Sequence, residues 1–148
     1  VKPGRLDDDE LVIMRRHCLY GCEILGPLDD REAAHRICSD VPLLRDQQPF
    51  DELALARILA LCHHERWDGG GYPFGLSGED IPVEARIVSV VDVYDALCSD
   101  RPYKTAMPPD EAAILIRDGA GTQFDPAVVD AFLCHRTEID AIRDRWRD

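Results

Sequence analysis

Two adjacent histidines, His63 and His64, end an apolar run of the chain and are followed at once by a glycine-rich turn. Adjacent imidazoles are costly to place at the end of a buried helix unless something uses their nitrogens, and neutral imidazole is the commonest side-chain metal ligand. Side chains at consecutive helical positions diverge by about 100°. The pair therefore suits two neighbouring metal ions, with one histidine serving each.

The turn that follows contains three consecutive glycines and ends in Gly71-Tyr72-Pro73. Glycine lets the backbone come close to a ligand, and Pro73 fixes the direction in which the chain leaves the turn. Tyr72 either offers its ring to a ligand or packs the loop onto the core. The preceding residues 65–68 are expected to lock the shape of this loop.

A second polar block lies downstream, where Asp92 falls on the apolar face of a predicted helix and Asp95 comes one turn later. A carboxylate in an apolar stripe is costly unless it is paired or bound to a metal. Arg101 and Lys104 follow the helix three residues apart, so both can face the same side. The alternative interpretation of these two cations is a solvated loop.

Closely spaced divalent metal ions would make such residues suitable for cutting a phosphodiester. Two or three ions can activate a water and neutralise the phosphoryl oxygens, and imidazoles with a bridging carboxylate are ligands that such ions take. The candidate ligands in this sequence are His17, His63, His64 and Asp92.

The elements that must position these residues are predicted to be helices. Apolar residues recur at three- and four-residue steps as far as Leu25, which predicts one helix there. His17 lies beside that stripe, and its helical position alone indicates a solvated or capping residue. Further helices are expected over residues 31–39, 53–62, 82–98, 109–118 and from 126 onward, and the run 53–62 is apolar enough to be central. Since no strand-like alternation persists, the fold class is predicted to be all-α.

The composition describes one domain over residues 1–148, with 45% hydrophobic and 31% charged residues. A net charge of −12 argues against a nucleic-acid polymer or an anionic membrane as the partner. No run approaches the ~18 apolar residues that span a bilayer, and no export signal is seen, so a cytoplasmic location is expected. An anionic ligand would need metal ions and a few cations to reverse the local charge.

Six cysteines lie in helix-like apolar runs without a Cys-x-x-Cys pair. We interpret them as buried, reduced thiols that act as small hydrophobes. Cys18 and Cys22 are one helical turn apart, which leaves a soft-metal site as a minor alternative.

The run from His63 to Pro73, with Asp-x-x-Asp-Ala-Leu from Asp92 and Asp-Arg-Pro-Tyr-Lys up to Lys104, resembles the HD-GYP family of metal-dependent phosphohydrolases. Characterised members of that family open cyclic di-GMP. The family is named for an upstream His-Asp pair and for the Gly-Tyr-Pro found here at residues 71–73. The resemblance covers nearly the whole chain and implies an HD-superfamily-like helical bundle.

The resemblance also implies roles for individual residues. His17, in its Arg-Arg-His segment, would be a metal ligand together with His63, His64 and Asp92, and the ions would be two or three of Fe or Mn. Asp95 would orient ligands or water. The residues expected to contact the nucleotide are Gly71, Tyr72, Pro73, Arg101 and Lys104.

The sequence departs from the family at its start. Family members carry a His-Asp pair and a Lys before a turn like Lys2-Pro3-Gly4, and this sequence begins at that turn. We therefore expect an N-terminally truncated domain, a fragment of a longer protein, with a natural short form that has lost catalysis as the alternative. Helices without their neighbours would expose apolar surface and favour self-association, for instance as a homodimer.

The sequence supports two hypotheses for the function, one an enzyme and the other a binding module. The first is a cyclic di-GMP phosphodiesterase that gives a linear dinucleotide or GMP, joined in its parent to a sensor or receiver domain. The second is a catalytically incomplete module that acts by binding the nucleotide or a partner protein. Hydrolysis of another nucleotide or phosphate ester is a third hypothesis, since metal-centred hydrolysis does not itself choose the substrate.

Overall fold

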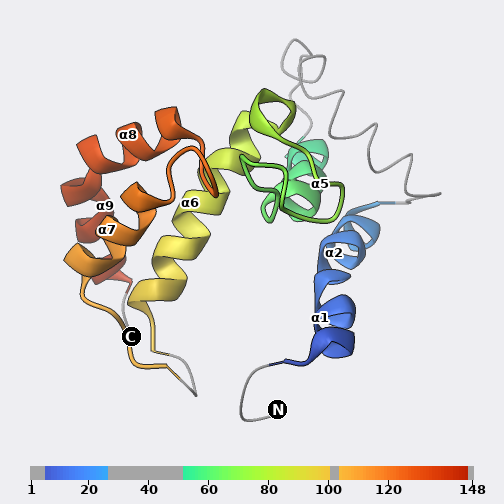
Figure 1. Ribbon diagram of the computed structural model, residues 1–148, viewed down its shortest axis with the longest axis horizontal. Coiled ribbons are helices and arrows are strands. Elements are labelled where there is room, and N and C mark those ends of the chain that lie inside the picture. The colour runs from blue at the N-terminus through green and yellow to red at the C-terminus, as the bar shows by residue number, and fades with distance from the viewer. Residues whose placement is uncertain (1–5, 27–51, 101–103, 147–148) are drawn as a thin grey trace.

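The computed structural model describes residues 6–26, 52–100 and 104–146, and within these ranges it contains helices but no β-strand. The prediction of an all-α fold is confirmed. The long helix α6 (Val83–Cys98) runs through the middle of the molecule. It contacts α5 on one side and α7 and α8 on the other, while α2 and α1 lie beyond α5 (Figure 1).

The N-terminal segment forms two helices where one was predicted. In α1 (Asp8–Arg15), Asp7 accepts the amide of Glu10, whose carboxylate accepts the amide of Asp7 in return. A turn at Arg16 interrupts the helix before α2 (His17–Leu25) begins. The prediction of a single helix is therefore wrong, and the interruption places His17 in the first turn of α2.

Helix α5 (Glu52–Cys62) packs on α2 and brings His63 and His64 to the end of the pair. It buries one face only, through Ile58, Leu61 and Cys62, and Leu53 is 59% exposed. The expectation of a fully central helix is thus wrong for its first turn. The core that α2 and α5 share is a cluster made of Cys22, Leu61, Cys62, Ile81 and Ala85.

A second core lies at the other end of α6, against α7 (Pro109–Asp118) and α8 (Pro126–Cys134). These bounds agree with the predicted helices at 82–98, 109–118 and from 126. The last predicted helix is divided at His135, and α9 (Arg136–Arg145) follows. Arg143 of α9 donates to the hydroxyl of the buried Tyr94 in α6.

Apolar side chains remain exposed on the N-terminal pair. Val12, Ile13 and Ile24 are 62, 65 and 84% exposed, in line with the expectation of uncovered apolar surface. Among the described residues, no helix has the length and apolar character that a bilayer crossing requires. The short helix predicted at residues 31–39 lies outside the described residues.

The cysteines are mostly free. Four thiols are unpaired, as predicted, although that of Cys134 is exposed rather than buried. Cys62 is disulfide-bonded, so the prediction of reduced thiols throughout is wrong at this position. Cys38 lies outside the described residues.

Candidate metal centre

Three histidines from two segments of the chain converge beside α5. The ring centroid of His17 lies 5.5 Å from that of His63 and 5.0 Å from that of His64. The centroids of His63 and His64 are 4.1 Å apart. The interruption at Arg16 and the end of α5 at Cys62 therefore bring together side chains that are distant in the sequence.

In His17 and His63, hydrogen bonds to main-chain carbonyls determine which ring nitrogen is available to bind a metal ion. Nδ1 of His17 lies 2.7 Å from the carbonyl oxygen of Met14, and Nδ1 of His63 lies 2.8 Å from that of Leu59. A carbonyl can only accept, so each Nδ1 carries the proton and donates it. In the neutral rings the Nε2 lone pairs are then available to a metal ion.

His64 is held neutral by its surroundings. Burial, and next the neighbouring His63 and His17, lower its pKa from 6.5 to about 4, while the carboxylate of Asp92 acts in the opposite direction. At pH 7 the ring is therefore uncharged, which is the form that binds metals. Asp92 is an exposed residue of α6, and its carboxylate is near enough to His64 to act on the pKa of the ring.

Tyr72 packs against the histidines. Its ring centroid lies 4.8 Å from that of His64 at an interplanar angle of 32°, and the guanidinium of Arg15 lies 5.0 Å from its centroid. Burial raises the pKa of its hydroxyl to about 12. Tyr72 therefore packs the loop onto the centre, and Arg15 brings a positive charge to it.

A buried carboxylate holds the glycine-rich loop. Glu65 is 3% exposed and accepts the amides of Phe74 and Leu76 at 2.7 and 3.0 Å. The loop comes back so closely that a Cβ on Gly71 would lie 2.4 Å from the amide nitrogen of Arg66 and 2.6 Å from Cα of Glu65. Only glycine fits there, because both neighbours are main-chain atoms.

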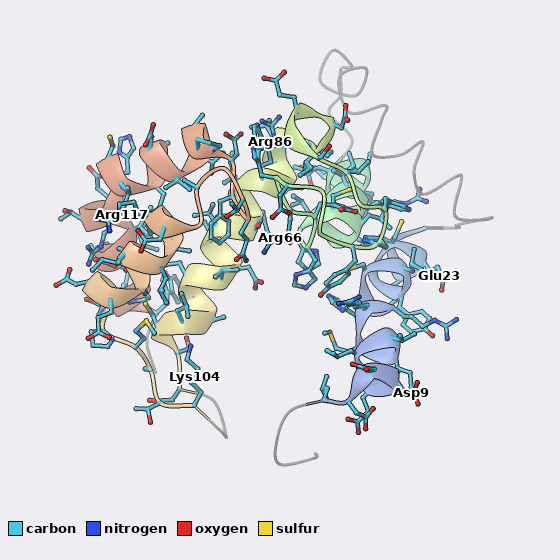
Figure 2. The ribbon with its side chains drawn as sticks, in the orientation of Figure 1. Asp9, Glu23, Arg66, Arg86, Lys104 and Arg117 are labelled. Atoms are coloured by element: carbon cyan, nitrogen blue, oxygen red, sulfur yellow. The ribbon has the colours of Figure 1, made fainter. Side chains whose placement is uncertain are left out.

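The outer side of the loop is fixed as well, as predicted for residues 65–68. Arg66 donates to Asp68 at 3.0 and 2.6 Å, and the amide of Asp68 donates to the carbonyl of Thr122 at 2.8 Å. Arg86 lies over the Trp67 ring at 5.7 Å (Figure 2 labels Arg66 and Arg86 in this region).

A cavity of about 210 Å³ opens between the loop and α6. Its walls combine ring, hydroxyl, amide and cationic groups. The side chains that line it include Arg15, His63, His64, Tyr72, Ser89 and Gln123.

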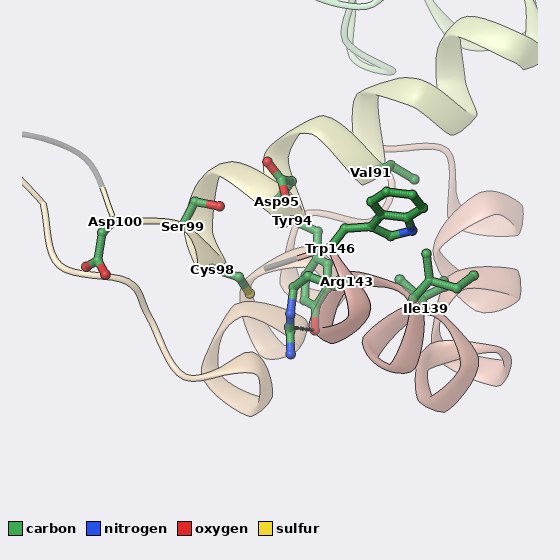
Figure 3. A pocket seen from close by; sticks show the side chains of 10 residues that line it. Val91, Tyr94, Asp95, Cys98, Ser99, Asp100, Ile139, Arg143 and Trp146 are labelled. Carbon is green, nitrogen blue, oxygen red and sulfur yellow. Dashed lines mark hydrogen bonds between the residues drawn. The ribbon is translucent and has the colours of Figure 1, made fainter. Parts of the chain in front are cut away.

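Two predicted site residues lie elsewhere. Asp95 lines a larger cavity of about 500 Å³ between α6 and α9, together with Arg143 and Trp146 (Figure 3). Lys104 lies beyond the C-terminal end of α6, away from the loop that carries Arg66 (Figure 2). Arg101 falls outside the described residues.

Three contributors to the site were not among the metal ligands and nucleotide contacts expected from the resemblance. Arg15 was visible as part of the Arg-Arg-His segment, and Glu65 was expected only to shape the loop. Cys18 was taken as a small hydrophobe, but its sulfur lies 3.6 Å from Nε2 of His17. The ligand atoms of His17, Cys18 and His63 all lie within 4.8 Å of one another.

The donor set fits a divalent transition metal. Imidazole nitrogens and a thiol are typical ligands of such ions, and the ligand atoms of His17, Cys18 and His63 lie within 4.8 Å of one another. His17 is exposed, so the site keeps a side open to solvent. An open position of this kind is typical of catalytic rather than structural metal sites.

Comparison with known proteins gives one family and several relatives. A family model described as HD domain matches residues 1–128. A probable cyclic di-GMP phosphodiesterase of Vibrio cholerae is 40% identical over 148 residues, which are 100% of this chain and 30% of the relative. The cyclic di-GMP phosphodiesterase response regulator RpfG of Xanthomonas campestris is 42% identical over 142 residues, 96% of this chain and 32% of the relative.

A further relative carries a different substrate in its name. The 3'3'-cGAMP-specific phosphodiesterase 2 of Vibrio cholerae is 36% identical over 142 residues, 96% of this chain and 23% of the relative. The chain thus spans less than a third of the length of these curated relatives.

Proposed function

The chain belongs to the HD domain family as a member of its HD-GYP group, and from this premise we propose that it carries metal ligands of a cyclic di-GMP phosphodiesterase. The reaction would be hydrolysis of a phosphodiester bond to give a linear dinucleotide or GMP. The observation that carries the proposal is the convergence of His17, His63 and His64, with ring centroids 4.1 to 5.5 Å apart.

The metal ligands in this proposal are His17, His63, His64 and Asp92. Two or three divalent ions, Fe or Mn, would lower the pKa of a water and offset the negative charge on the phosphoryl oxygens. Neutral imidazoles at His17, His63 and His64 would hold the ions without adding charge of their own.

The rest of the chain would position the nucleotide. Gly71 and Tyr72 line the cavity, and with Pro73 they would form the wall that meets the nucleotide. Glu65 keeps this loop in shape from inside through the amides of Phe74 and Leu76. Tyr72 keeps His64 in place through its ring contact. Arg15 brings a cation to the same wall, where it can meet a phosphate oxygen.

Three further residues stay predictions in this mechanism. We assign Arg101 and Lys104 to the phosphates and Asp95 to the orientation of ligands or water. Lys104 is exposed at the end of α6, so this role requires the segment that follows the helix to approach the nucleotide.

A second substrate is favoured by one finding. A relative named for 3'3'-cGAMP is 36% identical to this chain, only a few percent below those named for cyclic di-GMP. The two nucleotides differ in one purine base, so the same phosphodiester chemistry would serve both. A module that binds the nucleotide without cutting it is the other candidate, because four side chains leave much of a two-ion coordination shell to solvent.

In its parent protein the chain would work beside a sensor or receiver domain. The proposal is supported by the name of one relative, a response regulator, and by the much greater length of the relatives. Self-association as a homodimer stays a prediction.

Chromatography of cyclic di-GMP after incubation with the full chain and Mn or Fe tests the proposal. We expect linear product from the wild type, and a loss on the order of a hundredfold or more in His64→Ala, because the ions lose an inner ligand. His135→Ala is the matched control, since His135 is 71% exposed and pairs with Glu138 on the far helices. Equal turnover by His64→Ala and the wild type would refute the assignment.

The same assay separates the alternatives. Faster turnover of 3'3'-cGAMP than of cyclic di-GMP would assign the second substrate. Metal-dependent binding of cyclic di-GMP without any product would assign the binding module.

A further inference from the structure

The thiol of Cys18 lies inside the histidine cluster. Its side chain is fully buried in the first turn of α2, and its sulfur lies 3.6 Å from Nε2 of His17. Because Nδ1 of His17 donates to the carbonyl of Met14, Nε2 of the neutral ring accepts, and the thiol donates to it. The thiol proton of Cys18 therefore lies at the lone pair with which Nε2 of His17 would bind a metal ion.

We propose that Cys18 is a ligand of the metal ion held by His17 and His63, so that this ion has two nitrogen donors and one sulfur donor. The inference rests on the proposed function in one respect, that the same cluster holds an ion. It goes further in naming a sulfur ligand and, through it, the metal that the cluster prefers.

The distances match a tetrahedral zinc site. Zinc–sulfur and zinc–nitrogen bonds of about 2.3 and 2.0–2.1 Å at a tetrahedral angle place the two ligand atoms about 3.6 Å apart. The sulfur of Cys18 and Nε2 of His17 have this separation, 3.6 Å, without any adjustment.

The third ligand needs only a small movement. The ligand atoms of His17, Cys18 and His63 lie within 4.8 Å of one another. Two imidazole nitrogens bound to one zinc lie roughly 3.3 Å apart, so closing the triangle takes a side-chain shift on the order of 1 Å. As the sulfur–metal bond forms, the thiol proton leaves to solvent, and the exposed side of His17 leaves a fourth position to water.

Sulfur changes the metal preference of the cluster. Thiolates favour zinc and similar borderline ions, whereas manganese prefers oxygen ligands. At this one position the inference replaces the Fe or Mn of the proposed function, because an ion held by His17, Cys18 and His63 should be zinc or cobalt in preference to manganese. His64 and Asp92 remain for a second ion.

Cys22 provides the comparison within the same helix. It is as fully buried as Cys18 and lies one turn later, but its sulfur accepts from Nε of Arg57 at 3.5 Å and it belongs to the apolar cluster with Leu61. The structure therefore does not bring Cys18 and Cys22 together as a soft-metal site, which was the minor alternative from the sequence. Cys22→Ala removes the same atoms from the same helix without touching the histidines.

Titration of the full chain with Co²⁺ tests the inference, because cobalt bound to a thiolate absorbs strongly in the near ultraviolet through charge transfer. We expect this band in the wild type and in Cys22→Ala, and its loss in Cys18→Ala. The affinity of Cys18→Ala for zinc should fall on the order of a hundredfold. In a site with four ligands, each ligand contributes roughly a factor of one hundred to the association constant. Manganese affinity should change little.

The outcomes are distinct from those of the hydrolysis assay. Cobalt bound by the wild type without the charge-transfer band, or a band that persists in a helical Cys18→Ala, would overturn the sulfur ligand and leave the phosphodiesterase proposal intact. A chain that binds no cobalt would overturn the inference as well. A band that depends on Cys18 in a chain that cuts no cyclic dinucleotide would uphold it while the proposed function fails.

Discussion

His17 and His63 orient their rings in the same way, each through a bond from Nδ1 to a main-chain carbonyl of the preceding turn. Nε2 of each neutral ring is then the acceptor, and in His17 it lies 3.6 Å from the sulfur of Cys18. His64 reaches a neutral state by a different route, since burial and the two neighbouring rings lower its pKa to about 4. At the scale of residues, the centre thus depends on tautomers and burial as much as on residue types.

Gly71 is the position in the loop where a larger side chain fits least well. In Gly71→Ala the new methyl group would overlap main-chain atoms of Glu65 and Arg66. We expect destabilisation of about 1–3 kcal/mol, the usual range for overpacking, and weaker metal binding because the loop moves away from His64. Thermal unfolding and metal titration measure the two effects.

Gly70→Ala is the control for that substitution. A Cβ there would meet the side-chain tips of Asp68 and Arg66, at 3.1 and 3.5 Å, which can move aside. Its unfolding temperature should stay close to that of the wild type. Equal losses in the two variants would contradict the close approach at Gly71.

The residue types of the centre could be predicted from the sequence, but their partners could not. His17, His63 and His64 stood out by type and by resemblance. The partners of Glu65 are amides nine and eleven residues later, and no periodicity connects them. Cys18 shares its apolar stripe with Cys22, and only the fold shows that one thiol faces imidazoles and the other a guanidinium.

At the scale of elements, α6 connects the two cores. Ala85 near its start packs in the cluster beside α5, and Val90 and Tyr94 pack against α7 and α8. Arg86 links these halves, since it donates to the carbonyl of Ile81 at 2.8 Å and to Asp125 at 2.7 Å. The position of the loop beside α6 therefore depends on the start of α8.

Asp125→Ala tests this link. Asp125 is 5% exposed, caps α8 through the amide of Ala127 at 2.8 Å, and pairs with Arg86. Its removal takes away the cap and leaves a largely buried guanidinium without its carboxylate, so we expect a loss of roughly 3–5 kcal/mol. Chemical denaturation measures the change in the free energy of unfolding.

Asp7→Ala makes the same substitution at an exposed cap. Asp7 is the N-cap of α1, and its exposed side chain accepts the amide of Glu10. Its removal should lower the free energy of unfolding by about 1 kcal/mol. If both variants lose the same stability, the pair between Arg86 and Asp125 contributes nothing beyond the cap.

The helix bounds followed the sequence wherever a signal was present. Pro82, Pro109 and Gly119 lie at or next to helix ends, as their backbone restrictions predict. The interruption at Arg16 was missed because it falls within a continuous apolar period, and that at His135 because this residue does not break a helix by itself. Tertiary packing decides these positions.

At the scale of the whole molecule, charge sets the condition for binding an anionic ligand. The chain carries a net charge of −12, and Arg15 is a cation at the wall of the histidine cavity. In the proposed function, a cyclic dinucleotide would approach an acidic chain, and bound metal ions would reverse the sign of the charge locally. Affinity for the nucleotide should therefore depend on the metal.

Removal of the metal gives a direct prediction. After treatment with a chelator, affinity for cyclic di-GMP should fall by roughly tenfold or more and return when Mn²⁺ is added in excess. Calorimetric titration of the chain in the three states measures this. The same affinity in all three would mean that the nucleotide is held without the metal centre.

The all-α class was predicted correctly, whereas the spatial grouping of the polar residues was predicted only in part. Asp92 is near enough to His64 to act on the pKa of its ring, but Asp95, three positions later on α6, faces a second cavity with Trp146. A step of three helical residues turns the side chain far enough for this, and only the position of α9 shows what it meets. The place of Lys104 depends on the segment after α6, which no helical period describes.

The central claim is that His17, at the interruption between α1 and α2, completes a metal centre with the histidines that follow α5. Metal content of the reconstituted chain, measured by mass spectrometry, tests it most directly in the wild type, His17→Ala and His135→Ala. We predict bound divalent metal in the wild type and in His135→Ala and a clear loss in His17→Ala. Metal retained by His17→Ala at the level of the wild type would contradict the account.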